Sequence, residues 1–305
     1  MRFVFIIIIG FCFGLLIGFI YNFFKRPRHL PFSPYSPEQE ITLDGLKVHY
    51  IQEGTGPDLV LVHGIGSSIQ CWRWLFHLLK KNFRVTALDL TGFGESDRDP
   101  QGRYGLDDHT NRLLQFLNAL KIQKAHFVGA SMGGGISLWV AKLAPERVQS
   151  LVLISPAADH KVTWINPDYF IWLGHLVKHW LISPKVMRIA YAKALGDTKF
   201  LSKTAVLYHY RPFWKYPDTV IAFLKSMRAL RDKRLPSELH DIQQPCLILY
   251  GERDRVLPKK SIEKIQKVIS HSKVLYHKSG GHQLMEEDPQ FVSEEINKFT
   301  SSLQQ

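Results

Sequence analysis

A serine stands at the centre of the glycine-rich stretch Gly129-Ala130-Ser131-Met132-Gly133-Gly134-Gly135. An apolar run precedes this stretch and a helix-like apolar pattern follows it. A serine at the apex of such a strand-to-helix turn has a strained backbone and a projecting hydroxyl, and the turn forms only where its neighbours lack side chains. The pattern therefore predicts an exposed nucleophile at Ser131. Negative charge formed there would lie beside a helix amino terminus, whose dipole and free N–H groups stabilise it.

A serine hydroxyl is a poor nucleophile at neutral pH unless an adjacent base activates it and a third group orients that base. Asp254 and His282 each follow one of the last two apolar runs of the chain. Taken singly, His282 is one of 14 histidines, and Asp254 could cap a helix or pair with a neighbouring arginine. Their order after Ser131 and their places just beyond strands favour a Ser131-Asp254-His282 triad. Asp159 is the alternative acid.

Two backbone N–H groups are needed to bind the oxyanion, and the sequence indicates where they lie. One is the amide of Met132, directly after the nucleophile, and the other is the amide of Ile65 in the turn His63-Gly64-Ile65-Gly66. Losing one such donor typically costs about 3 kcal/mol of transition-state stabilisation. His63 resembles a catalytic base in type, but beside two glycines it is interpreted as a residue that holds the loop.

The remaining chain alternates between buried strands and amphipathic helices. Apolar runs predict strands at Leu59–Val62, Val85–Leu90, Ala125–Val128, Val148–Ile154, Cys246–Tyr250 and Lys273–Tyr276. Helical patterns lie between most of them, at Cys71–Leu79, Leu106–Leu120 and Ser261–Ile269. Alternation of this kind predicts an α/β fold with a mostly parallel sheet and helices on both faces. The segment Ile41–Gly54, with Asp44-Gly45 as its turn, predicts an antiparallel hairpin at the sheet edge.

The alternation stops after the strand that ends near Ile154. Residues 157–240 have helical patterns interrupted by prolines and no clean strand. An insertion after a strand's carboxyl end belongs at the ligand-binding rim of the sheet, so this segment is expected to form a helical cap or lid. The predicted core therefore comprises residues 41–156 and 241–302.

The amino-terminal region has the composition of a membrane anchor. Phe3–Phe24 contains 22 residues without a charge, enough for a helix of about 33 Å that crosses a hydrocarbon layer. A cleaved signal peptide is the alternative, but such peptides have shorter apolar cores and a small-residue cleavage site. Basic residues after the span outnumber those before it, which favours a catalytic domain on the cytoplasmic side. A proline-rich linker, residues 25–40, would tether that domain to the membrane.

The net charge of +12 is concentrated in the expected cap, where 14 Lys and Arg face 6 Asp and Glu. Four of the seven tryptophans, Trp164, Trp172, Trp180 and Trp214, lie in the same segment. Cations mixed with aromatics suit contact with anionic lipid. The alternative is that the aromatics line an apolar pocket and the cations form a solvated face. Nucleic acid is not an expected partner, because a catalytic triad and a membrane span indicate a membrane-bound hydrolase instead. None of the three cysteines indicates a disulfide or a metal site.

Together, several of these motifs resemble the α/β-hydrolase superfamily. The resemblance rests on His63-Gly64-Ile65-Gly66, Asp89-Leu90-Thr91-Gly92-Phe93-Gly94-Glu95-Ser96, Gly129-Ala130-Ser131-Met132-Gly133-Gly134, Asp254 and His282, and it spans about residues 41 to 302. Within the superfamily, epoxide hydrolases and haloalkane dehalogenases carry aspartate where this chain has Ser131, which argues against those two branches. The anchor and the serine turn are similar to membrane-anchored monoacylglycerol lipase-like hydrolases of the AB hydrolase-1 type.

This resemblance implies a serine hydrolase that cleaves carboxylic esters, such as monoacylglycerols or lysophospholipids, without a cofactor or metal. Its fold also hosts other functions, so three alternatives stay open: a carbon–carbon bond hydrolase, an acyltransferase on the same triad, and a ligand-binding protein without turnover. Oligomeric state, acyl-chain length and headgroup preference are not set by these motifs.

Overall fold

The structure is a computed structural model that describes residues 38–159, 168–178 and 182–303. The predicted membrane span, residues 3–24, and most of the predicted linker lie outside these ranges. Across the described residues, no helix is long and apolar enough to cross a bilayer.

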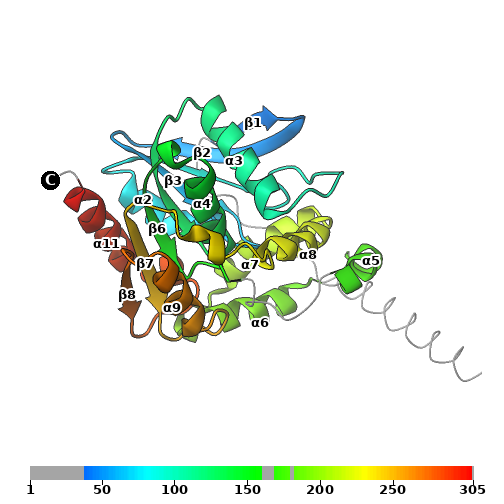
Figure 1. The fold of residues 1–305 in the computed structure, drawn as a ribbon. Helices are drawn as coiled ribbons and strands as arrows, with labels where there is room; N and C mark the ends of the chain where they lie inside the picture. The colour runs from blue at the N-terminus through cyan, green and yellow to red at the C-terminus, as the bar shows by residue number, and fades with distance from the viewer. Residues whose placement is uncertain (1–37, 160–167, 179–181, 304–305) are drawn as a thin grey trace, which may run out of the picture.

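The described chain contains one eight-stranded sheet (Figure 1), in the order β1-β2-β4-β3-β5-β6-β7-β8. The strands are β1 (Gln39–Leu43), β2 (Leu46–Glu53), β3 (Asp58–Val62), β4 (Arg84–Leu88), β5 (Ala125–Ala130), β6 (Val148–Ile154), β7 (Cys246–Gly251) and β8 (Lys273–His277). Strands β3 to β8 pair in parallel, while β1 and β2 form an antiparallel edge. The predicted mostly parallel sheet with an antiparallel hairpin at its edge is confirmed.

The edge hairpin turns at Asp44 and Gly45, whose φ angles are 50° and 77°. Two consecutive residues with positive φ are typical of the tight turn that matches the twist of paired strands. Strand β1 begins at Gln39, and Gln39 and Glu40 pair with Tyr50 and His49. The linker therefore ends earlier than the predicted residue 40. The two polar residues give no apolar signal because β1 is an edge strand with exposed positions.

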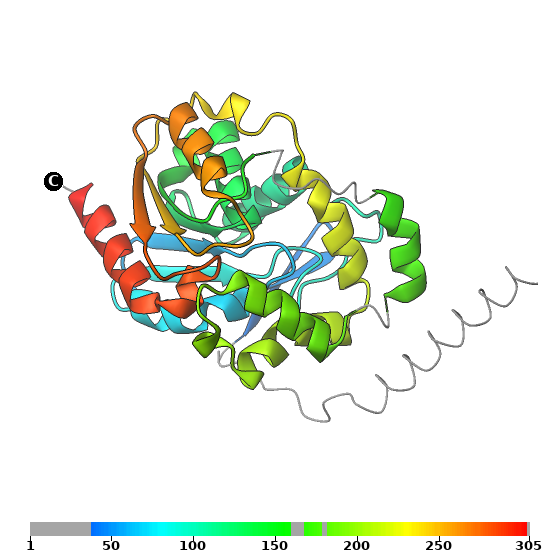
Figure 2. The ribbon, with the colours of Figure 1, turned by 90° about the horizontal axis from the view of Figure 1, so that it is seen from below.

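Helices cover both faces of the sheet (Figures 1 and 2). Alternate residues of β3 divide between the two sides: Leu59 and Leu61 pack in one apolar cluster, and Val60 and Val62 in the other. The first side is covered by η1 (Ile69–Trp72), α2 (Arg73–Leu79), α10 (Leu284–Glu287) and α11 (Pro289–Ser302). The second is covered by α3 (Leu106–Ala119), α4 (Met132–Leu143) and α9 (Lys259–Val268).

Between β6 and β7 the described chain is helical rather than extended. Its helices are α5 (Asp168–Val177), α6 (Pro184–Ala194), η3 (Thr198–Phe200), α7 (Lys203–Lys215), α8 (Thr219–Leu230) and η4 (Ser237–Leu239). Helices α5, α6, α7 and α8 lie together on one side of the molecule, with α5 outermost (Figure 1). A small apolar cluster that includes Tyr191, Leu195 and Val206 joins α6 to α7. We call residues 157–240 the cap.

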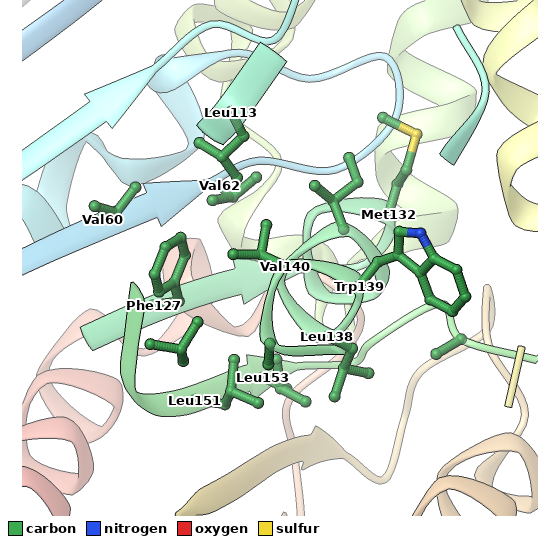
Figure 3. Close-up of a cluster of buried hydrophobic side chains, with 14 of the residues drawn as sticks. Val60, Val62, Leu113, Phe127, Met132, Leu138, Trp139, Val140, Leu151 and Leu153 are labelled. Carbon is green, nitrogen blue, oxygen red and sulfur yellow. The ribbon is translucent and has the colours of Figure 1, made fainter. Parts of the chain in front are cut away.

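Helix α4 holds the serine turn against the sheet. Its side chains Leu138 and Val140 are fully buried, and Val140 points toward Phe127 of β5 (Figure 3). Leu153 of β6 belongs to the same cluster. Because buried side chains in such a cluster are close-packed, the start of α4 has little freedom to move relative to the strand before it.

A core substitution should test this packing. We expect Leu153→Ala, at a side chain with 0% exposure, to lower the free energy of unfolding by about 2–5 kcal/mol, because it leaves a cavity under α4. Leu143→Ala, at a side chain of α4 that is 50% exposed, should change it by less than about 1 kcal/mol. Urea unfolding of both variants measures the difference, and equal losses would contradict the proposed packing.

Candidate active site

Ser131 lies in a strained turn between β5 and α4. Its backbone angles are φ 51° and ψ −118°, a region that residues with side chains rarely adopt. A Cβ added to Gly133 would lie 2.1 Å from the Val62 carbonyl oxygen, and one added to Gly129 would lie 2.6 Å from the Gly133 carbonyl oxygen. Both positions therefore require glycine, for the reason that the sequence pattern indicated. The Ser131 amide donates to the Ile154 carbonyl at 3.0 Å, which ties the turn to the neighbouring strand.

His282 and Asp254 are directly hydrogen-bonded. His282 Nδ1 lies 2.8 Å from Asp254 Oδ2, and the Asp254 side chain is completely buried. The other oxygen of Asp254 accepts hydrogen bonds from the amides of Val256 and Leu257 at 2.7 and 2.9 Å. Burial disfavours the charged carboxylate, but the hydrogen bond and charge of His282, together with the two amides, outweigh it and lower the pKa of Asp254. Asp254 is therefore a carboxylate that holds the imidazole from its Nδ1 side.

Asp159, the alternative acid of the sequence analysis, has different partners. Its carboxylate accepts a hydrogen bond from Lys264 Nζ at 2.6 Å and one from Ser261 Oγ at 3.4 Å, both on α9. The structure thus brings Asp254, rather than Asp159, to His282.

Ser131 and His282 face one cavity of about 370 Å³ between the sheet and the cap. The structure has no hydrogen bond between Ser131 Oγ and His282, although both residues are described. Catalytic hydrogen bonds are commonly long before substrate binds and shorten in the reacting complex. Because Asp254 engages Nδ1, the remaining ring nitrogen Nε2 is the one available as a base toward this cavity.

The loop after β3 packs directly over the serine. A Cβ added to Gly64 would lie 3.0 Å from the Ser131 Cβ, so the loop backbone and the nucleophile are in close contact. Ile65 follows Gly64 and lines the same cavity. Met132 is the first residue of α4, where backbone N–H groups have no intrahelical acceptor. Met132 is therefore adjacent to Ser131 in the chain, and Ile65 lies in the loop that packs over it.

His63 is held within this loop. Its Nδ1 lies 2.7 Å from the Gly64 carbonyl oxygen, and its Nε2 accepts a hydrogen bond from the Leu90 amide at 2.9 Å. Complete burial lowers the pKa of His63, which keeps the imidazole neutral. With both ring nitrogens occupied by backbone groups, His63 has the loop-holding geometry that its glycine neighbours suggested.

The cap joins the loop that carries His282. The His282 amide donates to the Ala194 carbonyl at 2.8 Å, at the end of α6. Glu287 accepts hydrogen bonds from the amides of Gly281 and Gly196, both at 2.8 Å, so one carboxylate bridges the histidine loop and the cap. Burial raises the pKa of Glu287. This bridge was not predicted from the sequence, because its partners are joined only by the fold.

A second carboxylate beside it, Glu286, is also unexpected. Glu286 forms an ion pair with Arg73 of α2 and accepts hydrogen bonds from Tyr191 Oη and His209 Nε2, each at 2.9 Å. Burial disfavours its charge, but the electrostatic attraction and hydrogen bonds of His209 and Arg73 outweigh burial and lower the pKa of Glu286 to about 2. We call Arg73, Tyr191, His209 and Glu286 the Glu286 cluster. No local sequence pattern predicts this cluster, because Arg73 and Glu286 are 213 residues apart.

The aromatic residues of the cap divide between the cavity and the surface. Phe213 is buried and lines the cavity, whereas Trp172 is 64% exposed. The Arg98 guanidinium packs on the Tyr216 ring, with Arg98 Cζ 4.1 Å from the ring centroid. The Tyr216 hydroxyl donates a hydrogen bond to Glu95 at 3.0 Å. Trp164 and Trp180 lie outside the described residues. Phe213 therefore agrees with the pocket interpretation, and contact of the exposed Trp172 with lipid stays a prediction.

Metal ligation has no candidate in the described ranges. They contain no group of three or more His, Cys, Asp or Glu side chains placed to hold an ion. The two described cysteines, Cys71 and Cys246, are buried free thiols.

A parallel sheet with a serine in a strained turn, an aspartate–histidine pair beyond later strands and a helical cap defines an α/β hydrolase. The chain belongs to the α/β hydrolase fold family, whose model matches residues 57–289.

Several named relatives are hydrolases. The chain is 29% identical over 273 residues to the uncharacterised hydrolase YugF of Bacillus subtilis (strain 168), which covers 87% of this chain and 98% of YugF. It is 26% identical to 2-hydroxy-6-oxo-6-(2'-aminophenyl)hexa-2,4-dienoic acid hydrolase of Metapseudomonas resinovorans, over 87% of this chain and 91% of the relative. A similar solved structure is a membrane phospholipase A described as a bacterial virulence factor, with a TM-score of 0.73 and 27% identity over 88% of this chain and 86% of that one.

The Glu286 cluster should give the stability of the fold a characteristic pH dependence. The pKa of Glu286 falls from 4.5 to about 2 on folding, so its ionised form stabilises the fold above about pH 4.5, and this contribution is lost as the pH falls toward 2. We expect Glu286→Gln to destabilise the protein by about 3 kcal/mol at pH 7, because it leaves Arg73 buried without its carboxylate. The difference in free energy of unfolding between wild type and Glu286→Gln should become smaller as the pH falls from 5 to 3.

Urea unfolding at several pH values measures this difference. Glu287→Gln is the matched control, since the pKa of Glu287 is raised rather than lowered. A raised pKa stabilises the fold at low pH, so wild type should gain stability relative to Glu287→Gln as the pH falls. If the loss of stability in Glu286→Gln did not change with pH, Glu286 would not be stabilised in its ionised form.

Proposed function

We propose that this α/β hydrolase is a serine esterase that cleaves carboxylic esters of lipids, such as monoacylglycerols or lysophospholipids, through Ser131, His282 and Asp254. The observation that carries the proposal is the 2.8 Å hydrogen bond between His282 and Asp254 at the cavity that Ser131 also faces. An imidazole oriented by a buried carboxylate, beside a serine in a strained turn, is the arrangement that activates a hydroxyl for attack on a carbonyl.

In the proposed reaction, His282 Nε2 takes the proton of Ser131 Oγ while the oxygen attacks the ester carbonyl. Asp254 stabilises the imidazolium that forms. The amides of Ile65 and Met132 donate hydrogen bonds to the oxyanion of the tetrahedral intermediate. His282 then protonates the leaving alcohol, and an acyl group stays on Ser131. Water, deprotonated by His282, attacks this acyl-enzyme and releases the acid.

A lipid substrate is supported by the cavity and its surroundings. Apolar cap residues, among them Met187, Phe213 and Leu224, line the cavity and suit an acyl chain. Exposed Ile189 and Trp172 of the cap would place apolar groups at a lipid surface. The similarity to a structure described as a membrane phospholipase A agrees with this substrate class. The proposal includes the membrane anchor at residues 3–24, with the catalytic domain on the cytoplasmic side.

Carbon–carbon bond hydrolysis is the second candidate. It is favoured by one observation, the 26% identity to a relative named as a hydrolase of a hexa-2,4-dienoic acid. The same serine, histidine and aspartate would serve that reaction, so only the substrate distinguishes the two. An acyltransferase would also use the acyl-enzyme but pass the acyl group to an alcohol or thiol instead of water.

The nucleophile can be tested by covalent labelling. We expect a fluorophosphonate probe to label wild type at Ser131 and to leave Ser131→Ala unlabelled, because the probe reacts with an activated serine hydroxyl. Asp254→Asn should slow labelling by a factor of about 10³–10⁴, since the imidazole loses the carboxylate that orients it. Ser237→Ala, in η4 away from the cavity, should label like wild type. Labelling of Ser131→Ala at the wild-type rate would rule out this nucleophile.

The substrate class can be tested by a hydrolysis screen. We expect esters of long acyl chains presented in vesicles to be cleaved with a kcat/KM at least about tenfold above that of short soluble esters, because the apolar cavity binds the longer chain. A dienoate with a carbon–carbon bond to cleave is included in parallel. Cleavage of the dienoate without any ester hydrolysis would replace the esterase by the second candidate.

A further inference from the structure

One part of the cavity wall is polar although the rest is largely apolar. Tyr191 of α6 and His209 of α7 are both buried and both line the cavity. Their rings pack with centroids 4.6 Å apart and planes inclined by 38°. Each donates a hydrogen bond to Glu286, which lies behind them on α10. The cap therefore presents two polar rings to the substrate space from a position held by the core.

The charge of Glu286 is already balanced by Arg73. In the tautomer that donates from Nε2 to Glu286, His209 keeps Nδ1 as a hydrogen-bond acceptor. Among the described residues, none forms a hydrogen bond with Nδ1. An acceptor on a cavity wall, turned to a fixed orientation by a buried carboxylate, has the arrangement of a ligand-binding group rather than that of a simple anchor between cap and core.

A second polar side chain borders the same cavity. Gln283 follows His282 and lines the cavity, and its Oε1 is buried without a hydrogen-bond partner among the described residues. A buried acceptor without a partner costs free energy, which a ligand hydroxyl can recover when the amide turns toward the cavity. His209 and Gln283 thus offer acceptors, and acceptors bind O–H donors. Carboxylate and phosphate groups without protons offer none.

We propose that His209 and Gln283 form a polar subsite that binds hydroxyl groups of the alcohol portion of the ester, so that the preferred substrates are esters of an uncharged polyol such as glycerol. This inference rests on the proposed esterase function and deepens it. The apolar walls hold the acyl chain, and the polar subsite holds the polyol while His282 protonates its leaving oxygen. Of the two lipid classes proposed above, the subsite selects monoacylglycerol-like substrates.

The first test compares two esters of one fatty acid, the 1-monoacylglycerol and the methyl ester. We expect wild type to prefer the glycerol ester, and His209→Phe to reduce the ratio of the two kcat/KM values about tenfold, mainly by raising KM for the glycerol ester. Phenylalanine keeps a ring beside Tyr191 but has no acceptor. Phe213→Leu, on the same helix and the same cavity, is the matched control and should change both substrates alike. An unchanged ratio in His209→Phe would overturn the subsite.

The second test uses wild-type protein alone, so it decides even if His209→Phe does not fold. Three ligands of one alkyl length that lack a carboxylic ester compete with the fluorophosphonate for Ser131: an alkyl glyceryl ether, an alkyl methyl ether and an alkyl phosphate. We expect the glyceryl ether to protect at about tenfold lower concentration than the methyl ether. Equal protection by these two would overturn the subsite, and so would strongest protection by the phosphate, which would indicate an anion site.

Failure of the subsite and failure of the esterase are distinguishable. If the probe does not label wild-type Ser131, the proposed nucleophile is wrong and the subsite falls with it. If the probe labels Ser131 but the glycerol moiety improves neither kcat/KM nor protection, the esterase stands and only the polyol subsite is overturned.

Discussion

The structure depends on a close contact between two turns, one after β3 and one after β5. Gly133 approaches the Val62 carbonyl so closely that no Cβ fits there, and a Cβ at Gly64 would lie 3.0 Å from the Ser131 Cβ, an unusually tight contact. This contact presses the loop after β3 onto Ser131 and keeps Ser131 in a backbone conformation that it would not adopt in isolation. Packing of α4 on the sheet maintains the strain, because the helix cannot retreat without opening the core.

Around that contact, the sheet brings residues from distant parts of the chain to one edge. Ser131, Asp254 and His282 each follow a parallel strand, β5, β7 and β8. Parallel strands end at the same edge of a sheet, so residues just beyond them converge even when the chain between them is long. The hydrogen bond between His282 and Asp254 is a consequence of neighbouring strands β7 and β8. The order of the parallel strands thus determines which residues meet at the candidate site, and the loops only adjust their positions.

The cap supports the site as well as covering it. Ala194 accepts a hydrogen bond from the His282 amide, and Glu287 joins the histidine loop to the start of the segment after α6. Glu286 anchors Tyr191 and His209 of the cap to Arg73 of the core. Two adjacent carboxylates on one short helix therefore position both the histidine loop and part of the cavity wall. The same two carboxylates hold the cavity wall and the histidine loop, so substitutions in the cap should also change the geometry of the candidate site.

By itself, the sequence determined the features that depend on neighbouring residues: the strands and helices, whose periodic apolar patterns report burial, the hairpin at Asp44-Gly45, and the glycines that a serine turn demands. It missed the polar start of β1, where an edge strand gives no apolar signal. Only the tertiary structure decided that Asp254 rather than Asp159 meets His282, and that Arg73 meets Glu286. These two pairings follow from the order of the strands in the sheet and from the packing of the cap on the core. A contact between residues far apart in the chain leaves no pattern in either segment, because each partner is stabilised by a group that only folding brings near.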